Sequence, residues 1–266
     1  MSPAAVEQRA APVIDRLVVI GLGLIGGSFA KGLRESGLSR EVVGFDLDAR
    51  SRELAVELGV VDRCADTLAE ACRDADVIQL ATPILALERL LGELAKLDLG
   101  SAVITDVGSA KGNVVRCARN VFGEMPSRFV PGHPIAGSEL SGVTAAKSTL
   151  FRRHKVILTP LKNTDPQALA LVTRLWAALG ADVEHMDVAH HDEVLAATSH
   201  LPHLLAFGLV DSLAKRHENL EIFRYAAGGF RDFTRIAGSD PVMWHDIFLA
   251  NREAVLHTLD DFRADL

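Results

Sequence analysis

The feature that most constrains this chain is a glycine-rich turn placed directly after a short β-branched run. Residues 17–21 (Leu-Val-Val-Ile-Gly) predict a fully buried strand, and a helix is expected from about Ile25 to Ser36, ended by Gly37. Between them, residues 21–26 (Gly-Leu-Gly-Leu-Ile-Gly) have the spacing G-x-G-x-x-G. After a strand and before a helix, this spacing is typical of a dinucleotide-binding turn, because its glycines permit a tight turn, close approach of a pyrophosphate and close packing of helix on strand.

An acidic residue at the end of the next predicted strand makes this interpretation more specific. Asp46 closes the buried run 42–46, where a carboxylate accepts hydrogen bonds from the adenosine ribose hydroxyls. The same charge repels a 2′-phosphate, so NAD is the expected cofactor, while the nearby Arg50 and Arg52 keep NADP as an alternative. The predicted cofactor-binding residues are Gly21, Gly23, Leu24, Ile25, Gly26, Asp46 and Thr82.

Strands and helices alternate along the first two thirds of the chain. Further helices are expected at 49–58, 67–73, 84–96 and 166–179, and further strands at 76–81, 102–107, 155–159 and 182–185. This alternation predicts an α/β fold with a doubly wound, Rossmann-type parallel sheet. No strand is predicted after Asp187, and residues 204–213 are apolar on nearly every side, as in a helix that is buried all round. We therefore expect a dinucleotide-binding domain over residues 1–187 and an all-helical dimerisation and substrate-binding domain over 188–266, which packs partly against a second subunit.

Composition excludes several other classes of protein. Hydrophobic residues make up 48% of the 266 residues and charged residues 24%, a balance typical of a compact soluble protein. The net charge of −7 is spread along the chain and offers no basic face for nucleic acid. Residues 17–30 are too glycine-rich and too few to span a bilayer, and residues 1–16 contain no secretory signal, so a cytoplasmic protein is expected. The widely spaced Cys64, Cys72 and Cys117 favour neither a disulfide framework nor a metal site.

Four polar clusters lie behind the glycine-rich turn, and they carry a family resemblance. They are Thr-Asp-Val-Gly-Ser-Ala-Lys-Gly at 105–112, Gly-His-Pro-Ile-Ala-Gly-Ser-Glu at 132–139, Ser-His-Leu-Pro-His at 199–203 and Phe-Arg-Asp-Phe-Thr-Arg-Ile-Ala at 230–237. In this order they resemble the prephenate and arogenate dehydrogenases of tyrosine biosynthesis, from about Leu17 to the C-terminal helices. The resemblance implies a homodimer that carries out an NAD-dependent oxidative decarboxylation. Hydride leaves the carbon that bears the ring hydroxyl, the ring carboxylate departs as CO2, and an aromatic ring results.

The resemblance also implies roles for two residues in the first half of the chain. His133 matches the catalytic histidine, which bonds the 4-hydroxyl and withdraws its proton as hydride departs, a role that suits an imidazole. Ser109 matches the serine that holds the same hydroxyl or the imidazole. A histidine that only caps a turn and a plain turn serine are the alternatives. Glu139, in the same string as His133, either regulates access or remains solvated.

Two further strings supply the predicted substrate-binding residues. Arg235 matches the arginine that binds a substrate carboxylate through both oxygens, and Arg231 is a further candidate. One of His200 and His203 is expected to face substrate or nicotinamide, whereas a metal pair or a structural role for both is the alternative. Trp244 is predicted to be a core residue.

Two other functions compete with this interpretation. A β-hydroxyacid dehydrogenase or imine reductase shares the two-domain architecture, and the former needs a catalytic lysine on a helix of the second domain. Lys215 is the only lysine after Lys162, and it lies in a charged run that predicts a solvated side chain. A nicotinamide-sensing binding protein would lack His133 or Ser109, and both are present. Prephenate and arogenate, which differ in a side-chain keto or amino group, both remain candidate substrates.

Overall fold

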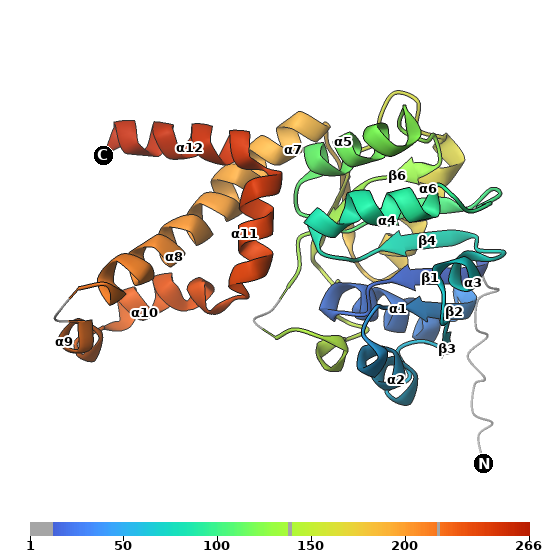
Figure 1. The fold of residues 1–266 in the computed structure, drawn as a ribbon, viewed down its shortest axis with the longest axis horizontal. Helices are drawn as coiled ribbons and strands as arrows, with labels where there is room; N and C mark the ends of the chain where they lie inside the picture. Colours follow the sequence, from blue (N-terminus) through green and yellow to red (C-terminus); the bar gives the residue numbers. More distant parts are fainter. Residues whose placement is uncertain (1–12, 138–139, 217–218) are drawn as a thin grey trace, which may run out of the picture.

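The chain is divided into a sheet-containing part and a helical part. A computed structural model describes residues 13–137, 140–216 and 219–266. Figure 1 shows the sheet with its covering helices in one half of the molecule and a group of helices that extends away from it in the other half. We call residues 13–185 the sheet region and residues 188–266 the helical region. The strand β9 ends at His185 and the first helix of the helical region begins at Val188.

A six-stranded parallel sheet forms the centre of the sheet region. The strand order β3-β2-β1-β4-β5-β6 is that of a doubly wound Rossmann sheet, in which the direction of winding reverses between β1 and β4. The predicted parallel, doubly wound sheet is therefore confirmed, and the strands expected at 17–21, 42–46, 76–81 and 102–107 all belong to it. The strands are β1 (Ile14–Ile20), β2 (Ser39–Phe45), β3 (Arg63–Cys64), β4 (Val77–Leu80), β5 (Val103–Asp106) and β6 (Phe129–Val130).

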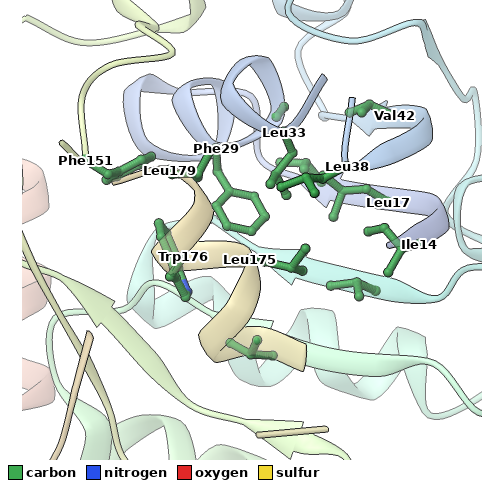
Figure 2. Packing of buried hydrophobic residues seen from close by; sticks show 14 of the residues in the cluster. Ile14, Leu17, Phe29, Leu33, Leu38, Val42, Phe151, Leu175, Trp176 and Leu179 are labelled. Carbon is green, nitrogen blue, oxygen red and sulfur yellow. The ribbon is translucent and has the colours of Figure 1, made fainter. Parts of the chain in front are cut away.

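Helices cover both faces of this sheet and bury its apolar strands. Figure 2 shows α1 and α6 packed together over one face, where the Phe29 ring lies 4.5 Å from that of Trp176 and the Phe151 ring 4.9 Å from it. Leu17 in β1 is fully buried, as expected for a parallel strand covered on both sides. The helices are α1 (Leu24–Ser36), α2 (Ala49–Glu57), α3 (Leu68–Cys72), α4 (Leu87–Leu94), α5 (Lys111–Phe122) and α6 (Pro166–Ala178), with short 3-10 turns η1 (Ile84–Ala86) and η2 (Val143–Ala145).

The later strands form a second sheet instead of extending the first one. The predicted strands at 155–159 and 182–185 correspond to β8 (Lys155–Leu158) and β9 (Asp182–His185), which pair in parallel. A three-residue strand that the sequence did not predict, β7 (Gly132–Pro134), pairs antiparallel with β8 and places His133 opposite Ile157. Three residues with a proline carry too little alternation to predict a strand. This small sheet brings His133 beside the carboxyl end of β5.

The helical region contains no strand among its described residues, as predicted. Its first three elements form one helical run, Val188–Ala214, which by length and composition alone could also cross a membrane. Little of that run is buried in one chain, and of the residues of α8 only Leu201 and Ala206 are buried. The elements are α7 (Val188–Leu195), the π-helical turn η3 (Ala196–His200), α8 (Leu201–Ala214), α9 (Asn219–Arg224), α10 (Gly228–Thr234), the 3-10 turn η4 (Arg235–Gly238), α11 (Pro241–Ala250) and α12 (Arg252–Asp265).

Candidate active site

The glycine-rich turn lies where the direction of winding of the sheet reverses. Gly21 has a φ of +96°, and a Cβ there would lie 2.4 Å from the carbonyl oxygen of Ala81 at the end of β4. A Cβ on Gly26 would lie 2.1 Å from the Gly21 oxygen, whereas Gly23 borders open space. The first and third glycines are therefore required by close backbone contacts. The open space at Gly23 is what a pyrophosphate requires at the second position.

Two further features of this turn fit a bound dinucleotide. The Thr82 hydroxyl, just after β4, is buried and has no hydrogen-bond partner among the described residues. The first turn of α1 carries no acidic side chain that would compete with a phosphate for its free N–H groups. Leu24 and Ile25 begin α1 and place those N–H groups at the turn. The chain therefore offers both a hydroxyl and an anion site to the cofactor.

Asp46 joins the end of β2 to the glycine-rich turn. One of its carboxylate oxygens accepts a hydrogen bond from the Leu22 N–H at 2.8 Å, and the other accepts one from the Asp48 N–H at 2.9 Å. A carboxylate oxygen accepts more than one hydrogen bond, so both remain available to ribose hydroxyls. Arg52, part of the case for NADP, donates to the main-chain oxygen of Asp46 at 2.7 Å. This bond uses one nitrogen of the guanidinium, and the preference for NAD depends on the Asp46 carboxylate, which repels a 2′-phosphate.

His133 belongs to a chain of three polar side chains that joins the two regions. Its Nδ1 lies 3.0 Å from Nε2 of His191, and Nδ1 of His191 lies 2.8 Å from a carboxylate oxygen of Asp192. His133 is 9% exposed, and His191 is fully buried. The sequence analysis missed His191 and Asp192. The one available signal was a His-His-Asp run, 190–192, in the helix that follows the last strand.

A buried ion pair holds the backbone next to His133. The Lys111 ammonium is fully buried, lies 2.5 Å from a carboxylate oxygen of Asp106 and donates to the Gly132 carbonyl at 2.5 Å. The Gly132 N–H in turn donates to the other Asp106 oxygen at 3.2 Å. Burial lowers the pKa of Lys111, and the Asp106 carboxylate opposes that shift. Both residues lie in the string 105–112, and the sequence analysis gave neither a role.

The electrostatic environment favours a neutral imidazole at position 133. Burial is the main cause that places the pKa of His133 well below its ordinary value of 6.5, and the neighbouring His191 and Lys111 add to the shift. Burial also lowers the pKa of His191, against the Asp192 carboxylate. Burial acts to raise the pKa of Asp192, but hydrogen bonds from His191 and from the N–H groups of Gly112 and Lys111 outweigh it and lower the pKa. At neutral pH the site thus contains a carboxylate and neutral imidazoles, and a neutral imidazole is able to accept a proton.

Ser109 lies in the loop between β5 and α5 and is partly buried. No hydrogen bond joins its hydroxyl to His133 or to any other residue that the structure describes. His191 is therefore the described residue that holds the His133 imidazole. The predicted role of Ser109 remains a prediction about the substrate hydroxyl.

The two histidines beside Pro202 occupy different environments. His200 is buried, its Nδ1 lies 3.1 Å from the amide nitrogen of Asn251, and burial lowers its pKa to about 4. His203 is partly exposed and stacks on Trp244, with ring centroids 3.6 Å apart and an interplanar angle of 18°. Its Nδ1 donates to the Ser199 carbonyl at 2.9 Å, which leaves Nε2 for a ligand. The structure therefore favours His203 over His200 as the residue that faces a ligand, and Trp244 is buried as predicted.

The predicted arginines lie apart from this network in one chain. Arg231 in α10 and Arg235 at the start of η4 are both exposed. Figure 1 shows α10 beside α8, with α11 between α10 and the sheet region. Ser138 and Glu139 lie outside the described residues. Lys215 is exposed and paired with Asp211 at 2.5 Å, as the sequence predicted for a solvated lysine. The described residues contain no cluster of three or more potential metal ligands.

Two family models and several known proteins match this chain. The family model described as prephenate dehydrogenase, nucleotide-binding domain, matches residues 29–185, and the one described as prephenate dehydrogenase, dimerization domain, matches residues 187–266. A cyclohexadienyl dehydrogenase of Zymomonas mobilis is 37% identical over 96% of this chain and 87% of its own length. A prephenate dehydrogenase of Bacillus subtilis is 41% identical over 93% of this chain and 67% of its own.

A solved structure gives the same result at the level of the fold. The crystal structure of prephenate dehydrogenase from A. aeolicus, in complex with hydroxyphenyl propionate and NAD+, aligns with a TM-score of 0.88 and 41% identity. The alignment covers 94% of this chain and 87% of that one. Neither matching family model is that of a β-hydroxyacid dehydrogenase or an imine reductase, so those alternatives are not supported.

Proposed function

The chain belongs to the prephenate dehydrogenase family and is an NAD-dependent dehydrogenase. From that premise we propose a role for each of its candidate site residues in the reaction. His133 is the general base, because it is the buried, neutral imidazole beside the carboxyl edge of the sheet. The burial and the neutral state of this imidazole are the main support for the proposal. Ser109 binds the ring hydroxyl of the substrate from the loop after β5.

The proposed reaction needs one proton acceptor and one hydride acceptor. Bound NAD accepts the hydride from the ring carbon that bears the hydroxyl. His133 takes the hydroxyl proton as that C–H bond breaks, which would leave a ring ketone. The electron pair from the departing carboxylate then converts the ketone into a phenolate, which takes the proton back from His133. The net change is hydride transfer, loss of CO2 and an aromatic ring.

We assign cofactor binding to the turn between β1 and α1. Gly21, Gly23, Leu24, Ile25 and Gly26 hold the pyrophosphate at the N-terminus of α1. Asp46 binds the adenosine ribose, and Thr82 offers its buried hydroxyl. The carboxylate of Asp46, which repels a 2′-phosphate, supports NAD in preference to NADP.

Substrate recognition is proposed to come from the helical region. Arg235 binds a substrate carboxylate through its planar guanidinium, with Arg231 as the second candidate. His203 faces substrate or nicotinamide through Nε2, while His200 supports the helical core. This proposal covers both prephenate and arogenate, which share the ring carboxylate.

We further propose a cytoplasmic homodimer, with the boundary between its two domains after residue 187. Large apolar side chains of the helical region are exposed in one chain, among them Leu209, Val242, Met243 and Leu249. The matching family model for this region is described as a dimerization domain. A cytoplasmic location is supported by the free thiols of Cys64, Cys72 and Cys117. Light scattering tests the dimer, and a monomer with full activity would contradict it.

The proposed function is tested by following nicotinamide reduction at its absorbance band. The purified chain is mixed with prephenate or arogenate, each crossed with NAD and NADP. We expect turnover with NAD and at least one of the two substrates, and weaker turnover with NADP. No turnover of either substrate with either cofactor would refute the proposed function.

A further inference from the structure

The hydrogen bonds around His133 define which of its nitrogens carries the proton. An ionised carboxylate only accepts hydrogen bonds, so Nδ1 of His191, 2.8 Å from Asp192, must be the donor. A neutral imidazole has one N–H, so Nε2 of His191 has a free lone pair. That nitrogen lies 3.0 Å from Nδ1 of His133, which must therefore donate to it. The consequence is that Nε2 of His133 is the unprotonated nitrogen.

We propose that His191 and Asp192 act as a positioning pair that fixes the tautomer and orientation of His133 for proton abstraction. The inference rests on the proposed function, because it concerns the same reaction. His191 and Asp192 touch neither substrate nor cofactor in it. They act through His133: the pair holds the proton on Nδ1, leaves Nε2 as the base, and stabilises the imidazolium that forms when Nε2 takes the substrate proton. An orienting carboxylate has the same role behind the histidine of a serine protease.

The position of Asp192 is itself fixed by the sheet region. Its two carboxylate oxygens accept hydrogen bonds from the N–H groups of Lys111 and Gly112, each at 2.8 Å, in the first turn of α5. A Cβ on Gly112 would lie 2.8 Å from one of these oxygens, so a glycine is needed for this approach. Helix α5 thus anchors the carboxylate through backbone groups that do not titrate.

The other charged and titratable groups around His133 come from three elements. Lys111 in α5 and Asp106 in β5 form the buried ion pair beneath Gly132, and His200 in η3 is hydrogen-bonded to Asn251. None of these groups is hydrogen-bonded to the His133 ring in the part of the chain that the structure describes. His191 is the group that contacts Nδ1, so its removal is the direct test.

The first test compares two substitutions of His191. His191→Phe keeps an aromatic ring, slightly larger than imidazole, and removes the acceptor for the His133 N–H, so we expect kcat to fall about 10- to 100-fold with the KM for substrate and for NAD within about threefold. His191→Gln keeps an acceptor amide oxygen and is expected to recover most of that loss. The matched control is His245→Phe, because His245 forms the same contact with its neighbour Asp246 on the exposed surface of α11. It is expected to change nothing measurable.

A pH profile separates positioning from mere packing. The acid limb of kcat/KM reports the pKa of the base in the free enzyme. Without an acceptor at Nδ1 the imidazolium is less stable, so the limb moves to lower pH in His191→Phe and stays near the wild-type position in His191→Gln. A purely structural role predicts equal loss in both variants and an unmoved limb, and that result would overturn the inference.

A second variant keeps the inference testable if His191→Phe does not fold. Asp192→Asn removes the charge that stabilises the imidazolium and is expected to lower kcat about 10-fold or more and to move the acid limb in the same direction. Asp165→Asn is its control, since Asp165 also accepts a helix N-terminal N–H, at α6. If the wild type turns over substrate but Asp192→Asn and His191→Phe fold and retain full kcat, the inference fails while the proposed function stands. If the wild type is inactive with both substrates, it is the proposed function that fails.

Discussion

The sheet region buries most of its large apolar side chains within one chain, whereas the helical region leaves many of its own exposed. Every buried member of the two large apolar clusters lies between Ile14 and Leu179, in the sheet region. The helical region contributes few buried apolar side chains and leaves large ones exposed. These exposed residues are Leu209, Tyr225, Phe233, Val242, Met243, Leu249, Leu256, Phe262 and Leu266. The sheet region thus completes its own core, whereas one chain does not complete the core of the helical region.

Where the two regions meet, hydrogen bonds between polar groups form much of the contact. The Asn251 amide donates to the Asp192 carbonyl at 2.9 Å and contacts His200, and Asp192 is bound to α5. The apolar part of the junction includes a small cluster of Ile84, Ala110 and Ala250, and Val188 packs against one of the two large clusters. Polar contacts depend on geometry, so the relative position of the regions is well defined without a large apolar interface. We infer that the sheet region supplies the base, that His191 and Asp192 of the helical region position it, and that the rest of the helical region supplies substrate binding and assembly.

The largest expected effect tests the sheet region's share of the chemistry. His133→Asn removes the proposed base and is expected to lower kcat by about 10²-fold or more, because general-base assistance contributes about 10² to 10⁴. The KM for substrate should stay within a few-fold, since this contribution is made mainly in the transition state. Steady-state kinetics on a variant with a wild-type melting curve measures both.

His154→Asn, an exposed histidine of the same region, is the control and should keep full activity. A folded His133→Asn enzyme that turns over at more than half the wild-type rate would reassign the base.

The next effect tests the helical region's share of substrate binding. Arg235→Ala is expected to raise the substrate KM by about 10- to 100-fold, corresponding to roughly 1.5–3 kcal/mol for a charge-assisted hydrogen bond. The value of kcat should fall less, because the carboxylate is bound before the reaction as well as during it. Arg235→Lys should recover only part of the loss, since an ammonium lacks the two-pronged donor geometry.

Arg263→Ala, an exposed arginine of α12, provides the control and should leave the substrate KM unchanged. The proposal that the helical region binds the substrate carboxylate through Arg235 would be contradicted if Arg235→Ala left the substrate KM at its wild-type value and weakened NAD binding instead. Arg231 would then become the first candidate for the carboxylate.

A smaller effect is expected at the cofactor site. Asp46→Ser removes the carboxylate that is proposed to bind ribose and to repel a 2′-phosphate. The KM for NAD should therefore rise about 10-fold, and the ratio of kcat/KM with NAD to kcat/KM with NADP should fall. Kinetics with both cofactors measure the ratio. Asp48→Ser is the control, because Ser also caps a helix N-terminus and Asp46 is left in place. Equal use of NAD and NADP by the wild type would contradict the role given to Asp46.

The sequence predicted the sheet region well and the active-site network poorly, for a physical reason. Buried parallel strands leave local signals, such as the β-branched run before Gly21 and the acid at Asp46. The three-residue β7 has no such signal, and its place in a second sheet depends on pairing with β8. His133 and His191 lie 58 positions apart and meet only after the two regions pack. Family resemblance therefore identified His133, whereas the residues behind it required coordinates.

The smallest expected effect concerns the point where the two regions meet. Gly112 lies in the first turn of α5, where alanine in place of glycine would ordinarily favour the helix by up to about 1 kcal/mol. Here the added Cβ would lie 2.8 Å from the Asp192 carboxylate and displace it, which offsets that gain. A displacement of about 1 Å near a reacting group can cost 10²-fold in rate. For a shift of a few tenths of an ångström we expect kcat to fall about 3- to 10-fold, with little change in melting temperature.

Gly92→Ala is the control variant for Gly112→Ala. Gly92 lies inside α4, and a Cβ there would meet nothing within 4 Å, so the same substitution should stabilise the protein by up to about 1 kcal/mol and leave kcat unchanged. Thermal unfolding and steady-state kinetics on the two variants separate helix propensity from the contact with Asp192. If Gly112→Ala behaved like Gly92→Ala, more stable and fully active, the contact between α5 and Asp192 would not control the chemical step. The two regions would then be joined at this point without being coupled in function.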